Sequence, residues 1–251
     1  MYNDEMAFPA EIKKKIVHSV EDAVGDDILT DIRQNNLFTN NNVPSRIWDL
    51  INTNLANSLA SAGCTVLQTH SGPWKLVVVY EEKSQFILTF MREKRFEELQ
   101  RLRHRRSHMH YLDMLSKVFN EKLEPDPQFK LFDHHFSDEN NISARTQTFL
   151  RGFQEESTTI RHHMLILFET TGFQLSHIRA VMITPNFDIA QNCNDDWSEY
   201  ISANESIVVE KVSEPIAPVN QPNRGLMLTN KALARKKNKP QRKANLLERE
   251  S

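Results

Sequence analysis

Residues 72–99 read GPWKLVVVYEEKSQFILTFMREKRFEEL, and this stretch decides the fold. A Gly-Pro-Trp turn precedes two apolar runs, residues 76–80 and 86–91, which flank a short polar connector. Two such runs around a short connector predict a β-hairpin. The second run ends in the charged residues 92–95, after which apolar residues recur at helical spacing. The stretch therefore predicts a hairpin that leads into a charged strand-to-helix corner.

A second hairpin is predicted further along the chain. The runs HHMLILFET (162–170) and LSHIRAVMIT (175–184) are separated only by Thr-Gly-Phe. Short connectors favour antiparallel pairing, because a parallel pair needs a crossover. Apolar spacing also predicts helices over 46–60 and 94–120 that cover the sheet, and residues 107–110 are a possible break in the second. The predicted fold class is α+β, with an antiparallel sheet built from two hairpins and covered by helices.

Weaker patterns predict further elements and the domain organisation. Four-residue apolar spacing indicates a helix or helix pair over 8–33, and other patterns predict strands at 65–68 and 206–212, a weak helix at 142–153 and a short capped helix at 195–201. We expect one α+β domain over 1–213, with halves 1–123 and 142–213 on either side of a polar loop. Residues 214–251 combine prolines, few aromatics and many cations, which predicts a disordered, flexible basic tail.

Composition excludes several classes of protein. The formal net charge is −2, but residues 224–251 carry nine Lys or Arg against two Glu, and residues 92–106 carry seven against three. The rest of the chain is therefore acidic, and contacts with phosphates should concentrate in those two segments. No apolar run approaches the roughly 18 residues of a membrane span. With six glycines, no GxGxxG or GxxxxGK phosphate loop is present.

The cysteine count and the N-terminal sequence indicate a compartment. Only Cys64 and Cys193 occur, too few for a secreted disulfide scaffold or for an all-cysteine metal site. The N-terminal residues lack the basic-then-apolar order of a signal peptide. We therefore expect a cytoplasmic protein that engages no membrane.

The charged corner supplies the candidate binding residues for nucleic acid or another anion. Arginine offers a planar fork of donors to phosphate, and lysine offers a point charge. Aromatic side chains beside basic residues can stack on bases, although the same residues can instead belong to the hydrophobic core. The alternative at the corner is a salt-bridged junction in which Glu93 pairs with a neighbouring arginine. The candidates are Arg92, Lys94, Arg95, Arg101, Arg103, Arg105 and Arg106, together with Lys75 and Trp74 from the hairpin.

Catalytic and metal motifs are weaker. Glu81 and Lys83 follow an apolar strand and match the Glu-x-Lys part of the PD-(D/E)xK nuclease motif. In such a nuclease the carboxylates would hold Mg²⁺. Glu81 and Lys83 fall where the hairpin must turn, so a solvated turn is the favoured interpretation. His104 and His108 have the spacing of a zinc pair, but surface histidines among arginines are favoured. No cofactor is expected, except Mg²⁺ under the nuclease alternative, and no catalytic residue is assigned.

Six short strings occur together in this chain: IWDLINTN (47–54), GPWK (72–75), FMREKRF (90–96), HY (110–111), LILFE (165–169) and WSEYI (197–201). They resemble a family of bacterial and phage-encoded proteins known only as a domain of unknown function. The similarity covers roughly residues 10–205. The resemblance implies a cytoplasmic prokaryotic or phage protein in the neighbourhood of toxin–antitoxin or phage-defence genes. It implies no activity and no catalytic residues.

Three functions follow as expectations. The favoured one is a cytoplasmic binding or effector protein, such as a toxin-like or phage-defence component. It would engage nucleic acid or a protein partner, such as an antitoxin or regulator, through the basic corner and the tail. The second is a metal-dependent nuclease, and the third is a protein–protein interaction module without nucleic-acid affinity.

Overall fold

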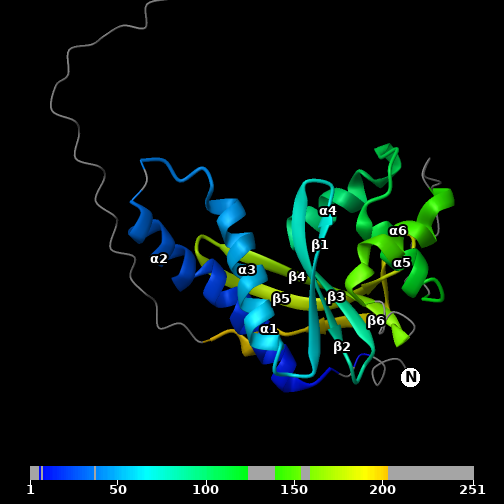
Figure 1. Ribbon diagram of the computed structural model, residues 1–251, viewed down its shortest axis with the longest axis horizontal. Coiled ribbons are helices and arrows are strands. Elements are labelled where there is room, and N and C mark those ends of the chain that lie inside the picture. The colour runs from blue at the N-terminus through cyan, green and yellow to red at the C-terminus, as the bar shows by residue number, and fades with distance from the viewer. Residues whose placement is uncertain (1–5, 7, 37, 124–138, 154–158, 203–251) are drawn as a thin grey trace, which may run out of the picture. The chain divides into compact units, whose positions relative to one another are not determined.

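A computed structural model describes residues 6, 8–36, 38–123, 139–153 and 159–202 (Figure 1). The α-helices are α1 (Ala10–Val24), α2 (Asp26–Asn35), α3 (Val43–Leu59), α4 (Glu93–Arg101), α5 (Tyr111–Phe119) and α6 (Ile142–Phe149). The strands are β1 (Cys64–Ser71), β2 (Trp74–Glu81), β3 (Phe86–Arg92), β4 (His162–Thr171), β5 (Gln174–Ile183) and β6 (Ile189–Asp196). Short 3-10 turns are η1 (Arg103–Arg105), η2 (Glu139–Asn141), η3 (Arg151–Phe153) and η5 (Ser198–Tyr200).

The strands form one six-stranded sheet in the order β1-β2-β3-β4-β5-β6. The prediction of an α+β fold with both hairpins in one sheet is confirmed. The sheet is antiparallel except where the hairpins meet, because β3 and β4 pair in parallel from Phe86↔His162 to Arg92↔Phe168. The segment between them crosses one face of the sheet with α4, α5 and α6, and such a crossover is what allows a parallel pair.

Helices cover both faces of the sheet (Figure 1). Alternate residues of each strand point to opposite sides, so β2 directs Val77 and Val79 to the core shared with α1 and α3. Its residues Leu76, Val78 and Tyr80 point to a second core, which is completed by α5 and α6. The strands of the two hairpins are therefore apolar on both faces, as their continuous hydrophobic runs require.

The first predicted helix is a helix pair. Gly25 lies between α1 and α2 with φ −104° and ψ −104°, outside the helical region, so the helix cannot continue through it. The predicted helix over 94–120 is interrupted, as the alternative of a break at 107–110 allowed, because α4 ends at Arg101 and α5 begins at Tyr111. The break is stabilised by a capping box in which the His110 side chain and Asp113 exchange hydrogen bonds with backbone N–H groups.

Strand β6 was not predicted from the sequence. Its residues, IAQNCNDD, are mostly polar, so they lack the apolar run that signals a strand. The predicted helix over 195–201 is corrected accordingly, because Asp195 and Asp196 end β6 and only Ser198–Tyr200 form a helical turn. The predicted strand 206–212, the loop residues 124–138 and the tail 214–251 lie outside the described residues. Of the helices that the structure describes, none has the length and hydropathy to cross a membrane.

Candidate functional site

The strand-to-helix corner is held by interactions on both faces of the sheet. The carboxylate of Glu93, the first residue of α4, is buried and accepts hydrogen bonds from Arg179 of β5 at 2.5 and 3.1 Å. The Arg92 guanidinium lies 5.9 Å from the centre of the Phe168 ring, and burial lowers its pKa. Glu93 thus has an ion-pair partner, as the salt-bridged alternative required, but the partner comes from a distant strand.

A buried aspartate anchors the basic segment after α4. Asp113 of α5 is fully buried, and its carboxylate accepts hydrogen bonds from Arg106 at 2.6 and 3.3 Å. The same carboxylate accepts the backbone N–H of His110 at 2.8 Å. The Nε atom of Arg103 lies 3.6 Å from its other oxygen. One carboxylate therefore neutralises two arginines of the predicted binding cluster inside the protein.

Arg103 also holds the turn between β5 and β6. Its guanidinium donates to the carbonyl oxygens of Pro185 at 2.7 Å and Asn186 at 3.0 Å. It lies 5.8 Å from the Phe187 ring, which stacks on Phe96 of α4. Burial lowers the pKa of Arg103, and the nearby Asp113 opposes that shift. Arg103 is 4% exposed, so its donors face protein rather than solvent.

The remaining cations of the segment point outward. Lys94, Arg101 and Arg105 are exposed, and in the part of the chain that the structure describes they form no ion pair. Lys94 and Arg101 are seven residues apart on α4, so they share one face of the helix. We call Lys94, Arg101 and Arg105 the basic ridge. The exposed Arg95 is paired with Glu98 at 3.1 Å, so it adds less free charge.

The hairpin residues Trp74 and Lys75 are exposed at the start of β2. Trp74 retains 49% of its surface, which excludes it from the core. The antiparallel pairing of β2 with β3, Val79↔Leu88 through Glu81↔Phe86, places the start of β2 at the same end of the sheet as the end of β3. Both residues therefore lie at the end of the sheet where α4 begins.

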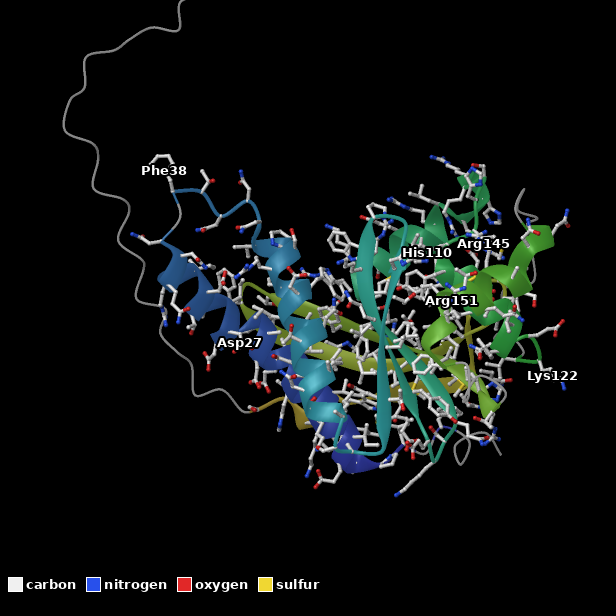
Figure 2. The ribbon with its side chains drawn as sticks, viewed as in Figure 1. Asp27, Phe38, His110, Lys122, Arg145 and Arg151 are labelled. Atoms are coloured by element: carbon white, nitrogen blue, oxygen red, sulfur yellow. The ribbon has the colours of Figure 1, made fainter. Side chains whose placement is uncertain are left out.

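The two helical layers carry opposite net charge. Residues 8–59, which hold α1–α3, have five Lys or Arg and seven Asp or Glu. The described residues 93–123 and 139–153, which hold α4–α6, have ten Lys or Arg and six Asp or Glu. Figure 2 shows Asp27 on the side of α1–α3 and Lys122, Arg145 and Arg151 on the side of α4–α6. The basic ridge therefore belongs to the positive side of the sheet.

A polar network is buried under α5, on the same side. The Thr89 hydroxyl of β3 lies 2.9 Å from Nε2 of His163 in β4, and Thr89 also bonds the side chain of Tyr111. Asn120 closes the network by donating to the backbone oxygens of His163 and Ile183, at 2.8 and 3.0 Å. Burial raises the pKa of Tyr111. Sequence reasoning did not find this network, because its members are single polar residues within or beside apolar runs.

Both histidines near this network are held neutral. His163 is fully buried, and burial lowers its pKa from 6.5 to about 3. Its Nδ1 atom has no hydrogen-bond partner among the described residues. The pKa of His110 is also lowered to about 3, mainly by burial and then by the charges of Arg106 and Arg95. His163 is thus enclosed, whereas His110 keeps partial contact with solvent.

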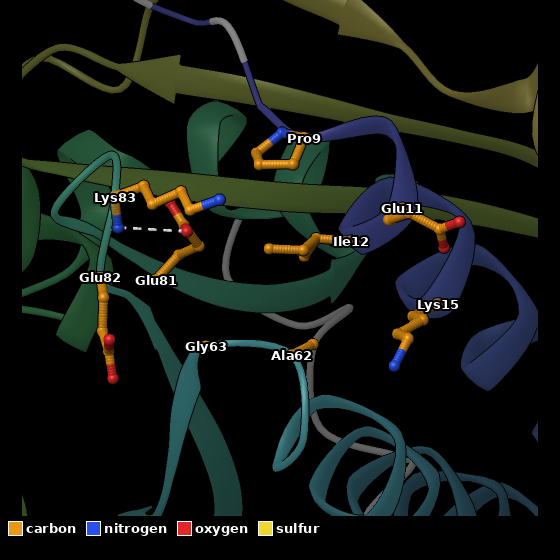
Figure 3. A pocket seen from close by; sticks show the side chains of 9 residues that line it. All are labelled: Pro9, Glu11, Ile12, Lys15, Ala62, Gly63, Glu81, Glu82 and Lys83. Atoms are coloured by element: carbon orange, nitrogen blue, oxygen red, sulfur yellow. Dashed lines mark hydrogen bonds between the residues drawn. The ribbon is translucent and has the colours of Figure 1, made fainter.

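The nuclease letters Glu81 and Lys83 lie beside a surface cavity of about 360 Å³ (Figure 3). The turn is solvated at Lys83 as expected, but the Glu81 side chain is buried at the end of β2. Its carboxylate accepts the backbone N–H groups of Lys83 at 3.1 Å and Ser84 at 2.7 Å, so it caps the β2–β3 turn. Among the described residues, no group of three or more His, Cys, Asp or Glu side chains is placed to hold a metal ion.

The buried thiol beside Glu81 has the properties of an inert cysteine. Cys64 lies opposite Glu81 in the β1–β2 pair. Burial, together with the charges of Glu81 and Glu82, raises its pKa to about 11. A reactive cysteine requires a lowered pKa and an accessible sulfur, and Cys64 has neither.

Comparison with known proteins adds one match. A model for a family of unknown function matches residues 6–247, which is nearly the whole chain. No curated protein and no solved structure matches the chain.

Proposed function

The chain belongs to the family of unknown function DUF5986. We propose that it is a nucleic-acid-binding protein whose phosphate contacts are made by the basic ridge. The observation that carries the proposal is the division of the cations after β3 into two groups. Arg103 and Arg106 are bound to Asp113, whereas Lys94, Arg101 and Arg105 project from the surface. The buried group fixes the segment, and the exposed group is left to bind anions.

The charge of the rest of the molecule supports one binding face. Phosphate contacts supply most of the affinity in sequence-independent nucleic-acid binding. The net positive side of the sheet attracts the phosphate backbone, while the acidic side with α1–α3 repels it. Binding through the basic ridge also places Trp74 and Lys75 at the same end of the sheet as the phosphates. An exposed tryptophan there offers a stacking surface for an unpaired base, which favours single-stranded nucleic acid.

The proposal describes binding and assigns no catalytic step. Glu81, the carboxylate of the nuclease alternative, already accepts two backbone hydrogen bonds. A cytoplasmic location fits the cysteines, because Cys64 and Cys193 are buried and form no disulfide.

Removing the basic ridge should weaken binding and flatten its salt dependence. We expect the triple variant Lys94→Ala/Arg101→Ala/Arg105→Ala to lower the slope of log affinity against log salt by about 2 to 3, because each lost phosphate contact removes about 0.7 to 0.9. The measurement is fluorescence anisotropy with a labelled single-stranded oligonucleotide at four or more salt concentrations. Thermal melting should be nearly unchanged, since exposed charges contribute only about 0 to 1 kcal/mol each.

The matched control removes three exposed cations elsewhere. Lys14 and Arg33 lie on α1 and α2, and Lys83 lies in the β2–β3 turn. Their simultaneous replacement by alanine changes the net charge equally and should leave the salt slope close to that of the wild type. Equal loss of affinity in both triple variants would show that only net charge matters, and absence of binding by the wild type would refute the proposal. A tighter complex with duplex than with single strands would contradict the assignment of Trp74.

A further inference from the structure

The two edges of the sheet are built differently. Strand β6 carries several devices that discourage pairing with another chain. Its register with β5 shifts between Val181 and Ile183, Asn192 has a positive φ of 57°, and Asp195 and Asp196 place charge at its end. Strand β1, at the opposite edge, has the sequence CTVLQTHS, with no Lys, Arg, Asp, Glu or Pro. Its register with β2 is unbroken over all eight residues.

The backbone of β1 offers a complete set of outward hydrogen-bonding groups. The backbone N–H of Glu82 donates to the carbonyl oxygen of Gly63, so Gly63 and Glu82 form a hydrogen-bonded pair of the β1–β2 ladder. Odd-numbered residues of β1 therefore direct their N–H and C=O groups to β2, and even-numbered residues direct theirs outward. Within the described residues, the outward groups of Cys64, Val66, Gln68 and His70 have no backbone partner.

Strand β1 is anchored by contacts on one face of the sheet. The Thr69 hydroxyl donates to the carbonyl oxygen of Phe149 at 2.8 Å, which ties β1 to α6. Leu67 packs on Gly152, where a Cβ atom would lie 1.9 Å from its Cδ1. A strand held in this way needs no ordering before it accepts another strand.

We propose that β1 pairs antiparallel with β1 of a second copy of this chain, which makes a two-fold symmetric dimer with one continuous sheet. The four outward positions are symmetric about Leu67. Cys64 then faces His70 of the partner subunit, Val66 faces Gln68 of the partner subunit, and the two Leu67 residues meet on the axis. A two-fold interface uses the same patch on both subunits. In this register the outward N–H and C=O groups of all four residues on each subunit find a hydrogen-bond partner on the other.

Charge favours a second copy in this orientation. The Cys64 end of β1 lies beside a cavity lined by three carboxylates and two lysines, a net charge of −1, whereas the Ser71 end lies beside Lys75. Antiparallel pairing places the acidic end of one copy next to the basic end of the other. Parallel pairing would place like charges together, at an electrostatic cost.

The first test changes the edge without disturbing the β1–β2 ladder. Gln68→Pro removes an outward N–H, and Gln68→Lys adds a charge at the centre of the interface; both are ways in which natural edges avoid pairing. By light scattering after gel filtration, the wild type should have twice the chain mass of 29.2 kDa, and both variants should have the monomer mass. Gln191→Lys on β6 is the matched control at the other edge and should stay dimeric.

The second test reads the register directly. Leu67→Cys should form an intermolecular disulfide under mild oxidation, because a non-hydrogen-bonded antiparallel pair brings Cα atoms to about 4.5 Å, within disulfide range. Thr65→Cys on the same face of β1 should not crosslink, since its two copies would be four residues out of register. A monomeric wild type, or a dimer that survives both Gln68 substitutions, would overturn the proposal. If Gln68→Pro does not fold, Gln68→Lys and the crosslink decide the question.

Discussion

Replacement of Asp113 by alanine should lower the free energy of unfolding by about 3–5 kcal/mol, the cost of leaving a buried ion pair without one partner. Asp113 is fully buried and accepts hydrogen bonds from Arg106 and from the backbone N–H of His110. Its loss removes the buried carboxylate that both Arg106 and Arg103 face, and it removes the Asp113 half of the capping box of α5. The measurement is urea unfolding followed by circular dichroism at neutral pH.

An exposed ion pair supplies the control for this effect. Glu98→Ala removes the partner of Arg95, and both side chains are at least one third exposed, so the change in unfolding free energy should be about 0 to 1 kcal/mol. Combining Asp113→Leu with Arg103→Met and Arg106→Met should recover part of the stability, because no uncompensated charge remains buried. An Asp113→Ala protein as stable as the wild type would mean that the two arginines find other partners or water.

Because of His163, acid should destabilise the protein already at pH values well above the pKa of its carboxylates. The pKa of His163 is about 3 in the folded state and 6.5 as an unperturbed group, so only the unfolded chain binds the proton between those values. Stability is therefore fully present above pH 6.5, is lost as pH falls towards 3, and changes no further below it. The expected slope is roughly 1 to 2 kcal/mol per pH unit for this histidine. His110, with the same shift and more solvent contact, adds a smaller effect of the same sign.

The measurement is the free energy of unfolding in urea at half-unit steps from pH 7.5 to 4.5. His163→Gln keeps a hydrogen-bonding group near Thr89 and cannot titrate, so the curve should become shallower over this range. Thr89→Val removes the hydrogen bond to Nε2 but leaves the imidazole buried, so it should lower stability at every pH while keeping the slope. Equal slopes in wild type and His163→Gln would show that water reaches the imidazole in the folded protein.

The sequence determined the two hairpins and the helices that cover them. The apolar runs at 76–80 and 86–91 and the largely apolar runs at 162–170 and 175–184 predict strands, and the short connectors favour antiparallel partners. The sequence also placed the cations at the corner after β3, since their positions follow directly from the end of an apolar run. These local patterns specify which residues are buried and the spacing at which buried residues recur along the chain.

Only the tertiary structure decided which of those cations face solvent and how the hairpins join. Residues far apart in the sequence meet in the parallel β3–β4 pair and in the ion pair between Glu93 and Arg179. The local spacing of apolar residues contains no information about such pairing. Arg101 and Arg103 are the same residue type only two positions apart. Arg103 is buried against Asp113 and the β5–β6 turn, whereas Arg101 is exposed. The reason is physical: the electrostatic environment of a side chain is set by its neighbours in space, and the crossover from β3 to β4 chooses those neighbours.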